Sequence, residues 1–413
     1  MTLGPLKIAI VSDLHIGDHA REYDLQPNGK APYQGYPGYL HYFRKIIEEN
    51  SLAADMLVVS GDITHQAQPS QFLHASKVIK ELAAMLSVPD GQIVAVPGNH
   101  DLNWDIANLA KASNEPFWLD YRFASFRYGS LDAGCADTMV AALLEPPHFY
   151  VHEQAAADLW CFNSAAYDLP DQKPHRGEIK ELHRAALQTQ LEARYKDKAK
   201  DKFRIFVTHH HPKPQPELYP DIPDFSGMVN GESLLDLLMD YRFDLVLHGH
   251  KHRPWCRPFL ESGKDPIVVW CSGSFAQTLG SAYYGSIGNL WHLAEVQGAT
   301  DVGHCFGFVK SWAFAPAQGW MPSRPAHHGI DHITPFGFLA DRATILELTR
   351  KELKKALDKK QTVRWEDVRT KQSTLQFQPG LVMWKILEDL SGELKFRIHG
   401  ERDSLDQLLI VKE

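Results

Sequence analysis

Short apolar runs alternate with longer amphipathic segments along most of the chain. The apolar runs are rich in Val, Ile and Phe and end in polar or turn residues, as buried strands do; they span residues 8–12, 56–60, 93–96, 159–163, 203–208, 245–247 and 267–271. Segments with helical spacing lie between them, at residues 40–49, 72–86, 182–195 and 232–241. This alternation predicts sheets that are covered by helices, which is an α/β architecture.

The pattern changes after residue 267. Residues 268–271, 290–296 and 306–314 read as consecutive strands without helices between them, which predicts a second, partly antiparallel sheet. A stretch rich in Pro, Gly, His and Ser follows, and we expect residues 318–335 to form a linker. The chain thus divides into one large domain over residues 1–317 and a small C-terminal α+β extension over residues 336–413, whose role no motif indicates.

The composition is that of a soluble protein, since 44% of the 413 residues are hydrophobic and 23% are charged. The net charge of −8 argues against a general nucleic-acid binder, although a local basic groove would still allow a nuclease. No apolar run is long enough to cross a bilayer, and the first strand begins so early that we expect no signal peptide. Five scattered cysteines, none in a Cys-x-x-Cys pair, indicate reduced thiols in a cytoplasmic protein.

Five polar clusters come directly after predicted strands, and strand carboxyl ends are where open α/β sheets collect catalytic groups. They are Asp13-Leu14-His15, Gly61-Asp62, Gly98-Asn99-His100-Asp101, His209-His210-His211 and Gly249-His250-Lys251-His252. Some have plain explanations when taken singly, such as a turn for Gly61-Asp62 or a helix N-cap for Asn99 and Asp101. Their common position at strand ends favours one shared metal site.

The spacing within these clusters suits metal ligands. Alternate residues of extended backbone share a face, so two side chains separated by one residue, as in Asp13-Leu14-His15 and His250-Lys251-His252, can reach one cation. Periodicity alone does not choose among the histidines of the triplet, because His209 and His211 share one face and His210 takes the other.

The cluster after the third strand offers both a metal ligand and a candidate catalytic residue. Asn99 offers a neutral amide oxygen to a metal, whereas His100 projects differently and stays available for acid or electrostatic work. Asp101 is placed in the sequence to orient the His100 imidazole, as carboxylates beside a metal site often do.

The order Asp-x-His, Gly-Asp, Gly-Asn-His-Asp, His-His-Pro and Gly-His-x-His resembles the calcineurin-like metallophosphoesterase superfamily over about residues 7–314. The resemblance implies a four-layer α/β/β/α sandwich with a two-metal cluster at one edge. It implies that one metal is held by Asp13, His15 and His252, the other by Asn99, His210 and His250, and that Asp62 bridges both. It also selects His210 within the triplet, because the ligand histidine of this superfamily lies two residues before the proline, here Pro212.

Imidazole, carboxylate and amide ligands without a thiolate suit two divalent ions of Mn, Fe or Zn better than Ca or Mg. Such a pair lowers the pKa of a bound water, and a bridging hydroxide would then attack phosphorus directly. His100, oriented by Asp101, would stabilise the developing charge or protonate the leaving oxygen. His65, His74 and His211 lie close to the ligands in sequence and are weaker candidates for substrate contacts.

The motif forms most resemble bacterial phosphodiesterases that act on cyclic nucleotides or glycerophosphodiesters, so we expect a small nucleotide-type phosphodiester as substrate. A nuclease or phosphomonoesterase is the alternative; Arg122, Arg127 and Arg253 could then hold a monoester, and residues 103–150 could form a lid or an ordinary helical cover. A non-catalytic scaffold is least favoured, because every ligand position is filled. The oligomeric state stays open.

Overall fold

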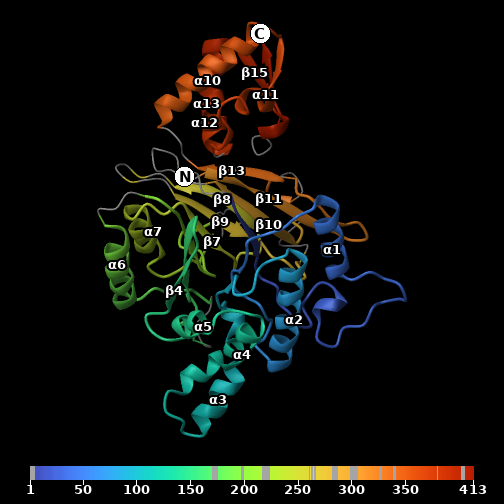
Figure 1. Cartoon of the computed structure of the whole chain (residues 1–413), viewed down its shortest axis with the longest axis vertical. Coiled ribbons are helices and arrows are strands. Elements are labelled where there is room, and N and C mark those ends of the chain that lie inside the picture. Colours follow the sequence, from blue (N-terminus) through green and yellow to red (C-terminus); the bar gives the residue numbers. More distant parts are fainter. Residues whose placement is uncertain are drawn as a thin grey trace.

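The architecture is built on two large mixed β-sheets that lie below a separate C-terminal unit (Figure 1). The computed structural model describes residues 5–169, 175–196, 200–215, 224–259, 261, 264, 267–280, 287–297, 306–324, 328–337, 341–378, 380–400 and 405–413. None of the helices in these ranges is long and apolar enough to cross a membrane.

The first sheet has the strand order β12-β11-β10-β1-β2-β3, with β13 also paired to β11. Its strands are β1 (Leu6–Val11), β2 (Met56–Val59), β3 (Ile93–Ala95), β10 (Leu290–Gln297), β11 (Phe306–Ala315), β12 (Gly319–Pro322) and β13 (Ile333–Gly337). Strands β1, β2 and β3 are parallel, whereas β10 is antiparallel to β1 and the remaining strands continue antiparallel from it. Three parallel strands therefore present their carboxyl ends at one edge.

The second sheet has the order β4-β5-β6-β7-β9-β8. Its strands are β4 (Phe149–Glu153), β5 (Ala157–Phe162), β6 (Phe203–Val207), β7 (Leu245–His248), β8 (Pro254–Phe259) and β9 (Ile267–Ser272). The four central strands are parallel, and only the edge strands β4 and β8 are antiparallel to their neighbours. This sheet also directs a set of parallel carboxyl ends to one edge.

Alternating side chains of the second sheet enter two different cores. Ile205 and Leu245 pack with residues of the first sheet, while Phe206 and Val246 pack under α6 (Glu181–Tyr195) and α7 (Gly231–Asp240). Helices α1 (Tyr39–Asn50) and α2 (Pro69–Met85) contribute buried residues to the core of the first sheet. The four-layer α/β/β/α sandwich predicted from the sequence is confirmed.

Two expectations about the region after residue 267 are wrong. Strand β9 does not begin a new sheet with β10; it pairs with β7 and β8, whereas β10 crosses to pair with β1. Residues 318–335 were expected to be a linker, but β12 and β13 both pair with β11. Proline and glycine are tolerated at sheet edges, so their abundance in this stretch did not exclude strands.

Residues 103–150 form a helical cover. They contain α3 (Trp104–Ala112), α4 (Ala124–Asp132) and α5 (Asp137–Leu144), and α3 projects away from the sheets at the lower end of the molecule (Figure 1). Helix α4 packs on α2, where the rings of Phe72 and Phe126 lie 6.1 Å apart edge to face. These contacts favour the cover over the lid that the sequence also allowed.

The C-terminal extension has its own apolar core. Its elements are α10 (Arg342–Leu357), β14 (Thr362–Arg364), α11 (Trp365–Arg369), α12 (Ser373–Gln376), α13 (Gly380–Leu394), β15 (Phe396–His399) and β16 (Leu409–Lys412). The antiparallel sheet β14-β16-β15 and its helices bury Trp365 and Ile386 completely. Phe377 joins this unit to the first sheet, because its ring lies 4.6 Å from that of Phe306. The extension is α+β, as predicted.

Candidate metal centre

The seven predicted ligands all follow the carboxyl ends of strands, and they come from both sheets. In the first sheet Asp13 and His15 follow β1, Asp62 follows β2 and Asn99 follows β3; in the second, His210 follows β6, and His250 and His252 follow β7. Because the two sheets lie face to face, loops distant in sequence meet at one edge. The structure brings all seven residues into two adjoining groups.

The first group consists of Asp13, His15, Asp62 and His252, whose ligand atoms all lie within 4.8 Å of one another. The Nε2 atom of His252 lies 3.1 Å from Oδ1 of Asp13 and 3.1 Å from Nε2 of His15. Asp13 and His15 are fully buried. Two carboxylates and two imidazoles that converge away from solvent form a donor set that a divalent cation would neutralise.

The second group consists of His209, His210 and His250, again with ligand atoms within 4.8 Å of one another. Asn99 joins this group, because its Oδ1 lies 3.2 Å from Nδ1 of His250. The rings of His210 and His250 are 4.5 Å apart. Burial lowers the pKa of His210 and of His250 well below the ordinary value, so both imidazoles are neutral, as metal ligands must be.

Asp62 lies between the two groups. Its Oδ2 is 3.5 Å from Nε2 of His15 in the first group and 3.3 Å from Nε2 of His209 in the second. Its Oδ1 accepts a hydrogen bond from the backbone amide of His100 at 2.9 Å. Burial alone would raise the pKa of the Asp62 carboxyl, but the surrounding imidazoles, His209 first, outweigh it and hold the pKa well below its usual range. An ionised carboxylate therefore faces both groups.

The histidine triplet places two imidazoles, those of His209 and His210, in the second group. The Nε2 atom of His210 is buried without a hydrogen-bond partner among the described residues, whereas Nε2 of His209 lies 3.3 Å from Oδ2 of Asp62. The Nδ1 atoms of His209 and His210 are held by Ser60 and Ser164, respectively. Burial would lower the pKa of His209, but the Asp62 carboxylate outweighs it and raises the pKa to about 9. The choice of His210 as the ligand stays a prediction.

Backbone strain concentrates on the predicted ligands. Five of them have a left-handed backbone, with φ of 51° at Asp13, 46° at His15, 49° at Asp62, 72° at His250 and 52° at His252. A non-glycine residue in this region costs about 1–3 kcal/mol, and such residues persist where the surrounding fold imposes them, typically at functional sites. The strain turns side chains at the strand ends inward, which their own conformational preference would not do.

Two glycines of the motifs leave room for the carboxylates. A Cβ atom on Gly98 would lie 2.1 Å from Oδ1 of Asp62, and one on Gly249 would lie 2.4 Å from Oδ2 of Asp13. Both distances are far shorter than any van der Waals contact. Glycine is therefore required at these positions because the loop backbone passes directly against a ligand, and not because of a turn.

The expectation that Asp101 orients His100 is wrong. The Nδ1–H of His100 donates instead to the carbonyl oxygen of His65, at 2.8 Å. Both oxygens of Asp101 accept hydrogen bonds from the backbone amides of Gly98, Ile63 and Thr64, at 2.9–3.1 Å. Asp101 ends the 3-10 turn η2 (Asn99–Asp101), so its side chain folds back to fasten the loop after β3 to the loop after β2.

Two serines that belong to no motif, and one backbone amide, support the ligands. The hydroxyl of Ser12 donates to Oδ2 of Asp13 at 2.6 Å, and the backbone amide of His250 approaches the same carboxylate at 3.1 and 3.2 Å. The hydroxyl of Ser164, after β5, lies 2.9 Å from Nδ1 of His210. A single serine gives no signal in a sequence, so these partners become visible only once the strands are placed.

The weaker candidates divide. The ring of His65 stacks on that of His100, with centroids 5.3 Å apart, and so lies beside the first group. His74 lies on α2 and its Nε2 pairs with the carbonyl oxygen of Asp24 at 2.8 Å. Two histidines of the C-terminal part of the chain were not predicted as ligands. His327 lies outside the described residues, and Nδ1 of His332 pairs with the carbonyl oxygen of Ser311.

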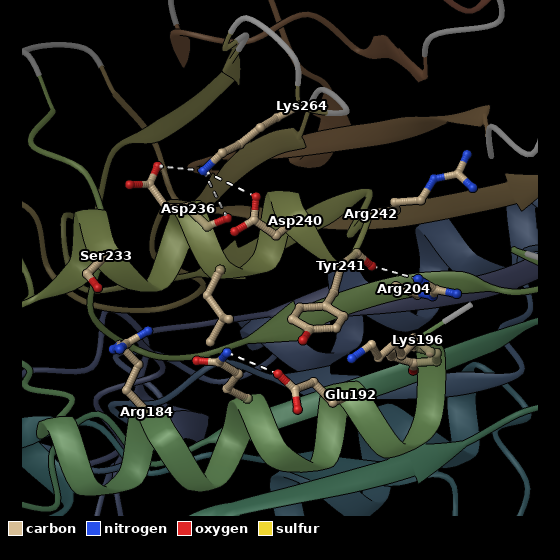
Figure 2. A pocket seen from close by; sticks show the side chains of 13 residues that line it. Arg184, Glu192, Lys196, Arg204, Ser233, Asp236, Asp240, Tyr241, Arg242 and Lys264 are labelled. Atoms are coloured by element: carbon tan, nitrogen blue, oxygen red, sulfur yellow. Dashed lines mark hydrogen bonds and ion pairs between the residues drawn. The ribbon is translucent and has the colours of Figure 1, made fainter. Parts of the chain in front are cut away.

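A cavity of about 700 Å³ lies elsewhere, between α6 and α7, and none of its lining residues is a predicted ligand. Figure 2 shows Lys264 directed at Asp236 and Asp240, and Arg204 paired with the carbonyl oxygen of Tyr241. Arg204 is the second residue of β6, whereas the histidine triplet follows the end of that strand. The cavity and the metal centre therefore lie at opposite ends of β6.

The donor set fits a pair of divalent ions. Asp62 faces both groups, buried imidazole nitrogens point into the second, and the ligands are imidazole, carboxylate and amide groups. Mn, Fe and Zn accept such ligands. The four cysteines among the described residues are free, and none belongs to either group.

Comparison with known proteins gave one match to a family model, described as calcineurin-like phosphoesterase, over residues 6–254. No curated protein matches the chain. Among solved structures, a purple acid phosphatase from yellow lupin (Lupinus luteus) seeds is similar, with 15% identity, a TM-score of 0.41 and coverage of 74% of this chain and 51% of that one. This chain thus spans about half the length of the lupin protein.

Two further structures are similar at the same low level. The phosphopantetheinyl hydrolase of Mycobacterium tuberculosis has 15% identity and a TM-score of 0.33, with coverage of 66% of this chain and 90% of that one. A predicted phosphoesterase from Streptococcus pneumoniae has 12% identity and a TM-score of 0.29, with coverage of 75% and 91%. Scores this low carry no argument about activity, so the assignment depends on the family model.

Replacing Asp62 with alanine should reduce metal binding at both groups, because this carboxylate faces both. We expect the wild-type protein to bind two equivalents of divalent metal and Asp62→Ala to bind fewer than one, measured by plasma mass spectrometry after gel filtration. Asp236→Ala, which changes an exposed carboxylate near Lys264, is the matched control and should keep two equivalents. A folded Asp62→Ala protein with two equivalents would contradict the bridging position.

The two adjacent histidines can be separated by their own substitutions. If His210 is the ligand, His210→Ala should lose one equivalent of metal, while His209→Ala keeps both and loses only part of its activity. Metal content and thermal unfolding should be measured on both variants. The reverse result, with one equivalent lost from His209→Ala alone, would show that the ligand lies one residue earlier.

Proposed function

Because this chain belongs to the calcineurin-like phosphoesterase family, we propose that it is a two-metal phosphodiesterase that hydrolyses a small nucleotide-type diester. The family supports a metal-dependent phosphoesterase; the diester and the pair of ions are our proposal. The observation that carries it is the Asp62 carboxylate, whose Oδ2 lies within 3.5 Å of imidazole nitrogens from both groups. A single ion would not need one carboxylate between two separate sets of ligands.

Two divalent ions at these groups would supply an activated water and neutralise the charge of the phosphate during in-line attack. The chain's own contribution is to hold the ligands rigidly. The backbone amides of His100 and His250 hold the carboxylates of Asp62 and Asp13, and Ser164 holds the ring of His210. Such hydrogen bonds set the direction in which each ligand presents its free atom.

His100 is placed to act on the substrate beside the ligands. Its ring meets that of His15 edge to face, with centroids 4.7 Å apart. Because Nδ1–H donates to the carbonyl of His65, Nε2 carries a proton only when the imidazole is charged. As an imidazolium, His100 would donate from Nε2 to a phosphate oxygen or to the leaving group.

Two of the three arginines that could hold a monoester are engaged elsewhere, whereas the third, Arg253, directly follows the predicted ligand His252; the preference for a diester is our proposal from the resemblance of the motifs. A monoester dianion needs cationic side chains at the site, and Arg122 and Arg127 were the candidates in the helical cover. Arg122 is buried and donates to the carbonyl oxygen of Ala166, while Arg127 pairs with Glu145 at a distance of 4.0 Å. Both side chains are thus engaged away from the two ligand groups.

The other expectations remain part of the proposal. A nuclease is the second candidate, but the net charge of −8 gives no general attraction for a polyanion. A non-catalytic scaffold is disfavoured, because the backbone is strained at five predicted metal-ligand positions and such strain is typical of functional sites. Free cysteines suit the proposed cytoplasmic location.

Activity should depend on metal and prefer a diester. We expect hydrolysis of bis(p-nitrophenyl) phosphate to exceed that of p-nitrophenyl phosphate, to stop after prolonged chelation, and to return best with Mn²⁺. Release of p-nitrophenolate, followed with metal content measured in parallel, tests this. Unchanged activity after verified metal removal would contradict the proposal, and a preference for the monoester would contradict its substrate.

His100→Ala should keep both metals and lose activity, because His100 is not among the predicted ligands and its Nδ1–H donates to the carbonyl oxygen of His65. We expect kcat to fall by about 10²–10⁴-fold, the usual range for loss of a general acid. His74→Ala is the control, since His74 lies on α2 and pairs with the carbonyl of Asp24. If His100→Ala loses an ion, or turns over normally, the assigned role is wrong.

A further inference from the structure

The side chain of Asp224, only 1% exposed, lies between two loops of the metal centre and belongs to neither. Its Oδ2 is 2.7 Å from Nε2 of His211 and accepts a hydrogen bond from the backbone amide of Gln215 at 3.0 Å. Its Oδ1 is 3.2 Å from Nζ of Lys251 and accepts hydrogen bonds from the amide and hydroxyl of Ser226. One carboxylate thus collects five donors from three segments.

The contact to His211 fixes the loop after β6. His211 is the residue directly after the predicted ligand His210, it is fully buried, and its ring stacks on that of His250 with centroids 5.9 Å apart. The backbone carbonyl of His211 also accepts a hydrogen bond from Met228, four residues beyond Asp224. His211 is therefore tied to the segment that carries Asp224 through both its side chain and its backbone.

The contact to Lys251 fixes the loop after β7. Lys251 lies between the predicted ligands His250 and His252, and its side chain is 13% exposed. Its ammonium group also donates to the hydroxyl of Ser226, at 3.3 Å. This half-buried lysine therefore ties the loop after β7 to the segment that carries Asp224.

Asp224 stays ionised in this position. Burial would raise the pKa of its carboxyl, but the hydrogen bond and charge of His211, with the amide of Gln215 and the ammonium of Lys251, hold the pKa well below its usual range. A permanent negative charge between two donors that come from different loops attracts both toward the same point.

We propose that Asp224 is a positioning residue of the metal centre, which ties the loop of His210 to the loop of His250 and His252 and so sets the spacing of the second group of ligands. The inference rests on the proposed two-metal function. The inference extends that function, because it names a residue that belongs to none of the sequence motifs and is not a predicted ligand. Loss of this carboxylate should loosen the second ion and leave the first in place.

The test compares metal affinity in Asp224→Ala, Asp224→Asn and the control Asp236→Asn. Affinity is measured by competition with a chromophoric chelator, and site geometry by the visible absorption of the Co²⁺-loaded protein. We expect the wild type and Asp236→Asn to bind two ions alike. Asp224→Ala should bind one of them 10–100-fold more weakly, the usual effect of losing a partner that orients ligands, with an altered Co²⁺ spectrum.

The metal affinity of Asp224→Asn should lie between those of the wild type and Asp224→Ala, because the amide keeps one acceptor oxygen but loses the charge. If circular dichroism shows that Asp224→Ala does not fold, the comparison is made with Asp224→Asn alone. The inference is overturned if folded Asp224→Ala and Asp224→Asn bind both ions with wild-type affinity and an unchanged Co²⁺ spectrum. If the wild type itself fails to bind two ions, the proposed function is what has failed, and the inference falls with it.

Discussion

The contact between Asp62 and His209 joins the two sheets, and the rest of the centre depends on it. Asp62 follows β2 of the first sheet and His209 follows β6 of the second, yet their side chains lie 3.3 Å apart. That approach requires the sheets to be packed face to face with both sets of carboxyl ends at one edge. The apolar layer between them, to which Ile8, Ile205 and Leu245 contribute, fixes this spacing.

The same layer explains how strained loops persist. The backbone amides of Asp13 and His15 donate to the carbonyl oxygens of Gly61 and Asp62, so the loops after β1 and β2 hold each other in the left-handed conformation. Each strained residue costs about 1–3 kcal/mol, and neighbouring hydrogen bonds together with the fixed strands offset that cost. The scaffold thus imposes the geometry of the predicted ligands.

Sequence alone located most of the strands and picked out the seven predicted ligands, because both depend on local pattern and on the order of short motifs. It failed where partners are far apart in sequence. Asp101 was paired with its neighbour His100, although its oxygens reach Ile63 and Thr64 in another loop. The residues of β12 and β13 were predicted to be a linker, because they are rich in proline and glycine, which edge strands also tolerate. Asp224 and Ser164 are isolated polar residues that no periodicity marks.

The pairing of β1 with β10 has a consequence for how the molecule is made. Ile8 pairs with Ala294 in this ladder. Nearly three quarters of the chain must therefore be synthesised before the antiparallel neighbour of the first strand is present. Until then one edge of a strand that is apolar except for Lys7 is open to pairing with other chains. A ribosome releases residues from the N-terminus onward, and contacts of such long range form slowly. Early synthesis is therefore the period in which this protein most needs a chaperone.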